Sequence, residues 1–238
     1  MKILTIHPIN EDLRFLKKLK RNLRNSFPHL VKTKTLSNNY SSHELAFKEI
    51  ELLNESDLVL FLCHGGTRNI HGSQFRSNYG SHRSRYVHSD NYGYFINKTN
   101  IDCLYLKKVF CLSCNSITLG KLAIESGAKV FIGFNTIDFD NREVLMPKEN
   151  PRHYVISKTK YALRTAVFNS IKLAINENLT FSQIVHILKV NLNKEMDNLI
   201  LMNKSKSGYK YYKEAANCIL IIKEGIRLFG NGNIRILD

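Results

Sequence analysis

The hydrophobic pattern of this chain consists of short apolar runs separated by longer amphipathic stretches. Three runs, 57–63, 109–113 and 130–134, are almost continuously apolar, which is typical of strands buried on both faces of a parallel sheet. Residues 2–7 and 30–36 predict two further strands, and the lysines of the second favour a place near a sheet edge. Because helical patterns lie between these strands, the order predicts a doubly wound α/β fold, with a mostly parallel central sheet in three α/β/α layers.

Apolar residues recur at helical spacing in six stretches. Asn10, the pair Ser41 and Glu44, and the pair Thr180 and Gln183 are residue types that cap helix N-termini. The expected helices run from Asn10 to Pro28, from Ser41 to about Leu53, over Thr118–Ser126, over Lys160–Asn176, from Thr180 to about Leu199, and over about 210–229. A last strand is expected at Asn233–Leu237. The chain is predicted to be one domain, 1–238, in which 158–238 carries the C-terminal helices and this strand.

Two long connections interrupt this order. Residues 67–102 combine arginine and histidine with tyrosine among small polar residues, and residues 135–157 contain Pro147 and Pro151. Connections of such length are uncommon in compact domains unless they have a function. Residues 67–102 therefore predict either a flap over a functional site or a solvated excursion with a small hairpin at 92–96.

The chain carries 35 Lys and Arg against 20 Asp and Glu, a formal net charge of +15. A nucleic-acid footprint would gather these cations on one face, whereas here they are spread along the sequence. Attraction to an acidic protein fits the charge equally well. Nucleic acid is therefore a possible partner but not the favoured one.

Composition narrows the class of protein. With 43% hydrophobic and 23% charged residues, the chain resembles an ordinary globular domain. No apolar run approaches the roughly 20 residues that span a bilayer, and the N-terminus lacks the features of a signal peptide. Five cysteines, an odd number at uneven spacing, do not indicate a disulfide framework. We therefore expect a cytoplasmic protein without membrane contact.

The candidate chemistry lies where two of the apolar runs stop. His64, with Gly65 and Gly66, follows the run 57–63, and Cys114 follows the run 109–113. Neighbouring parallel strands bring their carboxyl ends to one edge of the sheet, so a thiol would meet a base there. The two glycines would let a substrate approach the backbone, and the Gly65 and Cys114 amides would stabilise an oxyanion. This set predicts acyl transfer through Cys114.

Two other interpretations of these residues stay open. A Cys or His at a strand end is often a packed or satisfied residue, and Cys111, inside its strand, is expected to belong to the core. Cys63, His64, Cys111 and Cys114 also have the ligand types of a zinc site. Adjacent residues on a strand point to opposite faces, however, which disfavours convergence of Cys63 with His64.

Three segments resemble a CHAT domain, a family grouped with the caspases, metacaspases, separases and gingipains. They are Leu58–Gly65, Val109–Ser116 and Gly127–Phe134. The ending Leu228–Ile236 also resembles the closing segment of CHAT and gingipain chains. The similarity covers roughly residues 57–134 and the C-terminus. It implies a caspase-like fold in which His64 is the catalytic histidine and Cys114 the nucleophile.

The resemblance further implies a cysteine endopeptidase that needs no metal or cofactor. Such a protein would cleave a protein partner and be switched on by a partner or signal, in bacterial defence, including antiviral defence, or cell death. The pocket for the residue before the scissile bond would include Asn135, Thr136, Asp138 and Asp140. If Asp138 or Asp140 lines it, the preferred substrate residue is Lys or Arg. The more common role of Asp in such a segment is that of a solvated loop carboxylate. The alternative is a catalytically inactive caspase-like scaffold that binds nucleic acid or an acidic protein.

Overall fold

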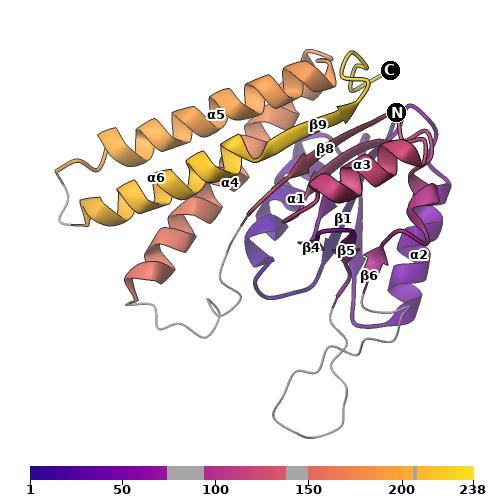
Figure 1. Ribbon diagram of the computed structural model, residues 1–238, viewed down its shortest axis with the longest axis horizontal. Helices are drawn as coiled ribbons and strands as arrows, with labels where there is room; N and C mark the ends of the chain where they lie inside the picture. The colour runs from indigo at the N-terminus through magenta and orange to yellow at the C-terminus, as the bar shows by residue number, and fades with distance from the viewer. Residues whose placement is uncertain (74–93, 138–149, 206–207) are drawn as a thin grey trace, which may run out of the picture.

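One six-stranded sheet organises the chain (Figure 1). The computed structural model describes residues 1–73, 94–137, 150–205 and 208–238. The strands are β1 (Ile3–Pro8), β2 (Val31–Leu36), β3 (Leu58–Leu62), β7 (Lys108–Leu112), β8 (Val130–Phe134) and β9 (Ile226–Gly230). Their order is β2-β1-β3-β7-β8-β9, in which the first five run parallel and β9 is antiparallel to β8. The five parallel strands were all predicted, with small differences at their ends.

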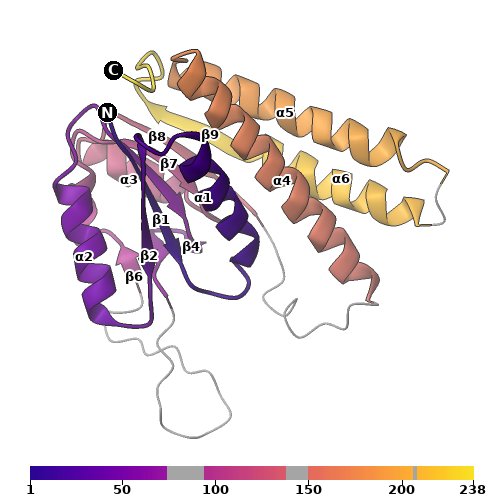
Figure 2. The same ribbon diagram turned by 180° about the vertical axis from the view of Figure 1, so that it is seen from behind.

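Helices cover both faces of this sheet (Figures 1 and 2). One face packs against α1 (Arg14–Ser26), α4 (Pro151–Asn176) and α5 (Phe181–Leu201), and the other against α2 (Tyr40–Glu51) and α3 (Ile117–Glu125). The sixth helix, α6 (Tyr209–Glu224), packs against α4 and α5. The predicted three-layer α/β/α architecture is therefore confirmed. Within the described ranges no helix is long and apolar enough to cross a bilayer.

The burial of each strand follows its sequence. β3, β7 and β8 are buried at every position, as their continuous apolar runs predicted. β2 forms an edge, and its Lys32 and Lys34 both pair with Glu49 of α2 instead of entering the core. Charged side chains on an edge strand also discourage pairing with another chain.

The predicted flap contributes small elements next to the sheet. A second, three-stranded sheet joins β4 (Gly65–Gly66), β5 (Asn69–His71) and β6 (Tyr94–Ile96), and a 3-10 turn, η1 (Ile101–Leu104), follows. β6 pairs antiparallel with β5, whereas residues 92 and 93 of the predicted hairpin at 92–96 lie outside the described residues. Residues 74–93, the middle of the predicted flap, lie outside the described residues.

Helix caps show where local sequence misleads. Asn39, not Ser41, caps α2, because its side chain accepts a hydrogen bond from the Ser42 amide. Asn10 does not cap α1, which begins after Leu13 without a side-chain cap. The box of Thr180 with Gln183 at the start of α5 is confirmed. Several residues able to cap stand near each start, and packing decides which one is used.

The helix α4 begins earlier than its hydrophobic pattern predicted. It starts at Pro151, with Asn150 as its cap, so the loop expected over 135–157 ends at the cap. Proline fits the first turn of a helix, where its missing N–H has no partner to lose. The loop prediction was wrong for the residues that follow Asn150.

The C-terminus differs most from expectation. The helix predicted over about 210–229 ends at Glu224, and Ile226–Gly230 forms β9 on the open edge of β8. The strand expected at Asn233–Leu237 is absent from the described residues, where Arg235 forms only an isolated bridge to Thr180. The edge of β8 offers unpaired main-chain groups, so tertiary pairing overrides the helical spacing of this segment.

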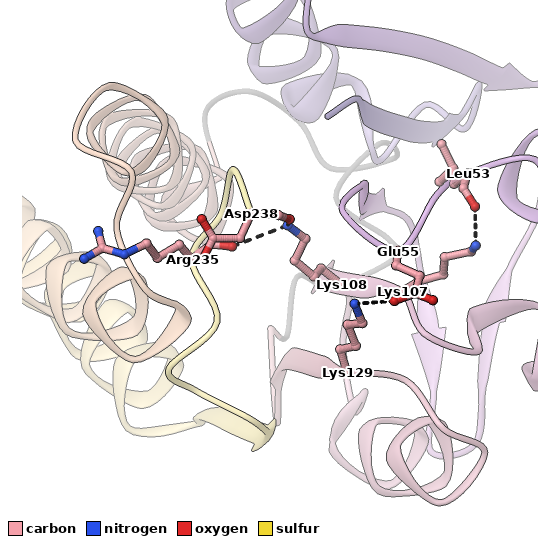
Figure 3. Close-up of polar contacts among 7 residues, drawn as sticks. All are labelled: Leu53, Glu55, Lys107, Lys108, Lys129, Arg235 and Asp238. Atoms are coloured by element: carbon pink, nitrogen blue, oxygen red, sulfur yellow. Dashed lines mark hydrogen bonds and ion pairs between the residues drawn. The ribbon is translucent and has the colours of Figure 1, made fainter.

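A buried cation holds the C-terminal segment in place (Figure 3). Lys108 of β7 is fully buried, and its Nζ donates to the main-chain oxygens of Ile236 at 2.9 Å, Asp238 at 2.6 Å and Arg235 at 3.3 Å. Figure 3 draws Lys108 with Arg235 and Asp238. Burial lowers the pKa of Lys108 to about 8. The tail in turn binds the connection between α4 and α5, because the Ile236 amide donates to the Leu179 oxygen. One lysine therefore joins the centre of the sheet to the last residues of the chain.

We expect Lys108→Met to loosen this tail. The substitution removes the hydrogen-bond donor of three main-chain oxygens. The unfolding free energy should therefore fall by about 1–3 kcal/mol. Hydrogen exchange at the Ile236 amide should become faster. Lys129→Met is the control, because the ion pair of Lys129 with Glu55 lies at the surface, where solvent screens it. Unchanged exchange in Lys108→Met would contradict the role of Lys108.

The change of unfolding free energy with pH provides a second test of the buried position of Lys108. The pKa of Lys108 in the folded chain, about 8, lies below its ordinary value of 10.5, so the unfolded chain binds this proton more readily between those values. The unfolding free energy of the parent chain, measured relative to Lys108→Met, should therefore rise with pH across that window.

Candidate active site

Four neighbouring strands deliver the candidate residues to one edge of the sheet. In the sheet order β1, β3, β7 and β8 are consecutive, and all four run parallel. Asp12 follows β1, His64 follows β3, Cys114 follows β7 and Ile137 follows β8. The carboxyl edge of a parallel sheet is the usual place for ligand binding in α/β folds.

His64 and Cys114 lie on the same face of the sheet. β3 and β7 pair with Leu62 opposite Leu112, and both of these side chains pack against the core beneath α1 and α4. His64 and Cys114 come two residues after this pair, in the segments beyond β3 and β7, so their contacts decide where they lie. Cys114 packs against the same core, and His64 meets Asp12, which precedes α1, a helix on that face. An imidazole and a thiol are therefore directed to one side.

The imidazole of His64 is engaged with a carboxylate. Its Nε2 lies 2.5 Å from Oδ2 of Asp12, at an angle outside hydrogen-bond geometry, and the two side chains are 25% and 23% exposed. Burial alone would raise the pKa of Asp12, but its contact with His64 and the positive charge there bring that pKa below its ordinary value. The pair therefore favours an ionised carboxylate beside the ring.

The loop that carries Asp12 is fixed from two sides. His7 of β1 donates from Nε2 to the Leu13 oxygen at 3.1 Å, and Lys160 of α4 donates to the Asp12 main-chain oxygen at 3.3 Å. Burial lowers the pKa of His7 to about 4, so its ring stays neutral. Asp12 was not predicted as a site residue. Its place, shortly after the predicted strand 2–7, was the available signal.

The turn after β7 sets the position of the thiol. Asn115 takes a positive φ of 53°, which asparagine tolerates well, and its amide donates to the Asn135 oxygen. Ser116 is fully buried, and its Oγ accepts from the Phe134 amide at 2.9 Å. These bonds tie the turn to the end of β8.

The Cys114 thiol also reaches this neighbouring strand end. Its Sγ donates to the Ile137 oxygen at 2.8 Å, and the side chain is partly buried. A thiol has one proton to donate, so transfer of that proton to His64 requires the bond to Ile137 to break. In this arrangement the candidate nucleophile is held in its protonated form.

Only part of the predicted substrate pocket belongs to the described residues. Asn135 and Thr136 follow β8, and the Asn135 main chain bonds both the Cys114 turn, at Asn115, and the oxygen of Gly225. The structure therefore brings this predicted segment beside Cys114. Asp138 and Asp140 lie outside the described residues.

Gly65 fills a tight space between the two strand ends. A Cβ on Gly65 would overlap the Ser113 Oγ and the Cys114 main-chain oxygen. The room that its missing side chain leaves is thus occupied by the end of β7, whereas the sequence suggested room for a substrate. The two predicted oxyanion donors, the amides of Gly65 and Cys114, consequently belong to neighbouring residues in space.

The remaining cysteines of these strands face the other way. Cys63 and Cys111 are buried in the core beneath α2 and α3, as predicted for Cys111. Burial raises the pKa of the Cys111 thiol to about 12 and that of Cys63 well above its ordinary value. Cys63 and Cys111 therefore do not converge with His64 and Cys114 on a zinc ion. Among the described residues no cluster of three or more metal-binding side chains occurs.

We expect Gly65→Ala to disturb the site and lower stability. The added methyl must displace backbone of the Cys114 turn, and overpacking of this kind costs about 1–3 kcal/mol. Gly66→Ala is the matched control, because its methyl would meet only the flexible Asn69 side chain at 2.7 Å. Chemical denaturation of both variants tests this, and equal stabilities would contradict the packing argument.

Comparison with known proteins does not place this chain in a family. No protein-family model, no curated protein and no solved structure matches it. The CHAT resemblance therefore stays a prediction from the residues that carry it. What the structure itself shows is a mostly parallel α/β/α sheet with an imidazole, a carboxylate and a thiol at the carboxyl edge.

Proposed function

We propose that this chain is a cysteine endopeptidase of caspase-like, CHAT-type architecture. One observation carries the proposal: the segments that follow three adjacent parallel strands, β1, β3 and β7, carry Asp12, His64 and Cys114, and the contacts of the last two lie on one face of the sheet. A base oriented by a third group, near a nucleophile, is the general arrangement for covalent catalysis. No part of it requires a metal or cofactor.

The reaction would proceed by acyl transfer. Cys114 Sγ loses its proton to His64 and attacks the carbonyl carbon of a peptide bond. The amides of Gly65 and Cys114 stabilise the oxyanion that forms. The C–N bond then breaks, the amine leaves with the proton from His64, and water hydrolyses the thioester to restore the thiol.

Asp12 would serve as a positioning residue. Its carboxylate lies against Nε2 of His64 and is anchored through its own loop by His7 and Lys160. A carboxylate in this place stabilises the imidazolium that appears during proton transfer and restricts the ring to fewer orientations. The proposed constellation is therefore Asp12, His64 and Cys114.

The described conformation has the features of a resting state. The Cys114 proton is directed to the Ile137 oxygen, and the nearest charged contact of His64 is Asp12. Catalysis needs the thiol to leave Ile137 and the ring to take up its proton. This requirement supports the expectation that a partner protein or signal switches the peptidase on, as the CHAT resemblance implies for defence or cell-death proteins.

We expect Cys114→Ala and His64→Ala each to abolish proteolysis, because each removes a group that reacts. A panel of fluorogenic peptides, together with labelling by a thiol-reactive peptide, measures activity and modification of Cys114. Cys218→Ala, which removes a partly exposed cysteine of α6, is the control and should keep full activity. Cleavage that persists in Cys114→Ala would remove this mechanism.

We expect Asp12→Asn to lower kcat by about 100-fold with little change in KM, because misorientation of the base affects the chemical step more than substrate binding. Asp12→Glu should restore part of the rate, since it keeps the charge. Steady-state kinetics and a melting curve for both variants separate this effect from unfolding. Equal kcat values for Asp12→Asn and the parent chain would exclude a positioning role.

A further inference from the structure

The exposed side of α1 is entirely basic over most of its length. Arg14, Lys17, Lys18, Arg21 and Arg24 are its exposed charged residues, and they form what we call the basic face. At 100° per residue these five positions fall within an arc of about 120°. The opposite side carries three leucines that are buried in the core.

Nothing within the helix neutralises this charge. α1 contains no Asp or Glu, and in the described part of the chain no carboxylate pairs with any cation of the basic face. Several lysines outside α1 do form ion pairs: Lys32 and Lys34 both pair with Glu49, and Lys129 pairs with Glu55. Like charges three or four residues apart destabilise a helix by about 0.2–0.5 kcal/mol per pair. The basic face is thus a feature that does not help the helix to form.

The neighbouring helix extends the positive surroundings. α4 packs beside α1 on the same side of the sheet, and it also contains no Asp or Glu (Figure 2). Its Tyr161 is 55% exposed, with the Arg164 guanidinium 5.3 Å from the ring centre. The helix packed beside the basic face therefore adds no negative charge to it.

We propose that the basic face binds the phosphate backbone of nucleic acid. The helix rises about 1.5 Å per residue, so Arg14 and Arg24 lie about 15 Å apart along its axis. One strand of duplex DNA presents a phosphate about every 3.4 Å of axis, or four to five phosphates over the same length. Five cations in one row match this density of charge.

The chemistry of the face favours nucleic acid over other anionic partners. Protein interfaces centre on buried aromatic or aliphatic anchors, and the basic face offers no large exposed apolar side chain. A membrane-surface helix inserts its apolar side, but the leucines of α1 are already buried in the core. Phosphate contacts need only cations at regular spacing, which is what α1 presents.

Binding of a fluorescein-labelled duplex of 20 base pairs, followed by anisotropy from 50 to 300 mM NaCl, tests this proposal with the full chain. Five phosphate contacts predict a slope of log K against log salt of about −4 to −5. The triple variant Lys17→Gln, Lys18→Gln, Arg21→Gln should reduce the slope by about 2.7 and lower affinity at least tenfold. Proteolytic activity does not enter the measurement, so the result is independent of the peptidase proposal.

A matched control removes the same charge elsewhere. The triple variant Lys98→Gln, Lys121→Gln, Lys194→Gln changes three exposed lysines on other elements and should keep the parent slope. Equal losses in both variants would assign binding to net charge and overturn the proposal. Polyglutamate that displaces the duplex as well as unlabelled duplex does would assign the face to an acidic protein and also overturn it. Circular dichroism and a melting curve for both variants check that the helix content and the stability of the chain are retained.

Discussion

The register between β3 and β7 is the constraint on which the candidate site depends. The two strands pair residue for residue from Leu58 with Lys108 to Leu62 with Leu112, a constant offset of 50 positions. The same offset separates His64 from Cys114, so the chain emerges from both strands in step. A slip of one residue would turn one of the two side chains to the opposite face. Because both strands are buried on both sides, such a slip would also break two cores, and packing therefore protects the site geometry.

The same edge accounts for the electrostatics of the site. β1 lies beside β3, so the loop after β1 reaches His64 and offers it the Asp12 carboxylate. β8 lies beside β7, so the segment after β8 offers the Cys114 thiol the Ile137 oxygen. Each candidate catalytic group thus meets a partner from the strand on its outer side. The sheet brings the imidazole and the thiol to one edge, but the thiol donates its proton to Ile137 and not to His64. This arrangement fits the inactive state of the proposed peptidase.

The sequence predicted the structure best where a local pattern of residues determines the secondary structure. Continuous apolar runs located the buried strands, and the residues that end them pointed to His64 and Cys114. It predicted the structure least well where a contact with a distant segment of the chain determines the conformation or burial of a residue. Asp12 matters through its contact with His64, which follows β3, and Ile226–Gly230 is a strand because β8 leaves an edge open. Lys108 lies just before the predicted strand 109–113, yet it is fully buried because the C-terminal segment supplies oxygens for its ammonium. These outcomes depend on pairs of residues far apart in the chain, which local patterns do not encode.

The two sides of the helix α1 have opposite effects on its stability: its buried leucines stabilise it, whereas the repulsion among its exposed cations destabilises it. Burial of Leu16, Leu19 and Leu23 contributes about 1.5–3 kcal/mol for each side chain, far more than the repulsion within its row of cations removes. The fold therefore tolerates the basic face without needing it, which favours binding as its explanation. Arg14, the first of its cations, is two residues from Asp12. A phosphate chain bound along α1 would bring negative charge close to the Asp12–His64 pair, so occupancy of this face and the proposed catalysis would be coupled through charge, and more strongly at low salt.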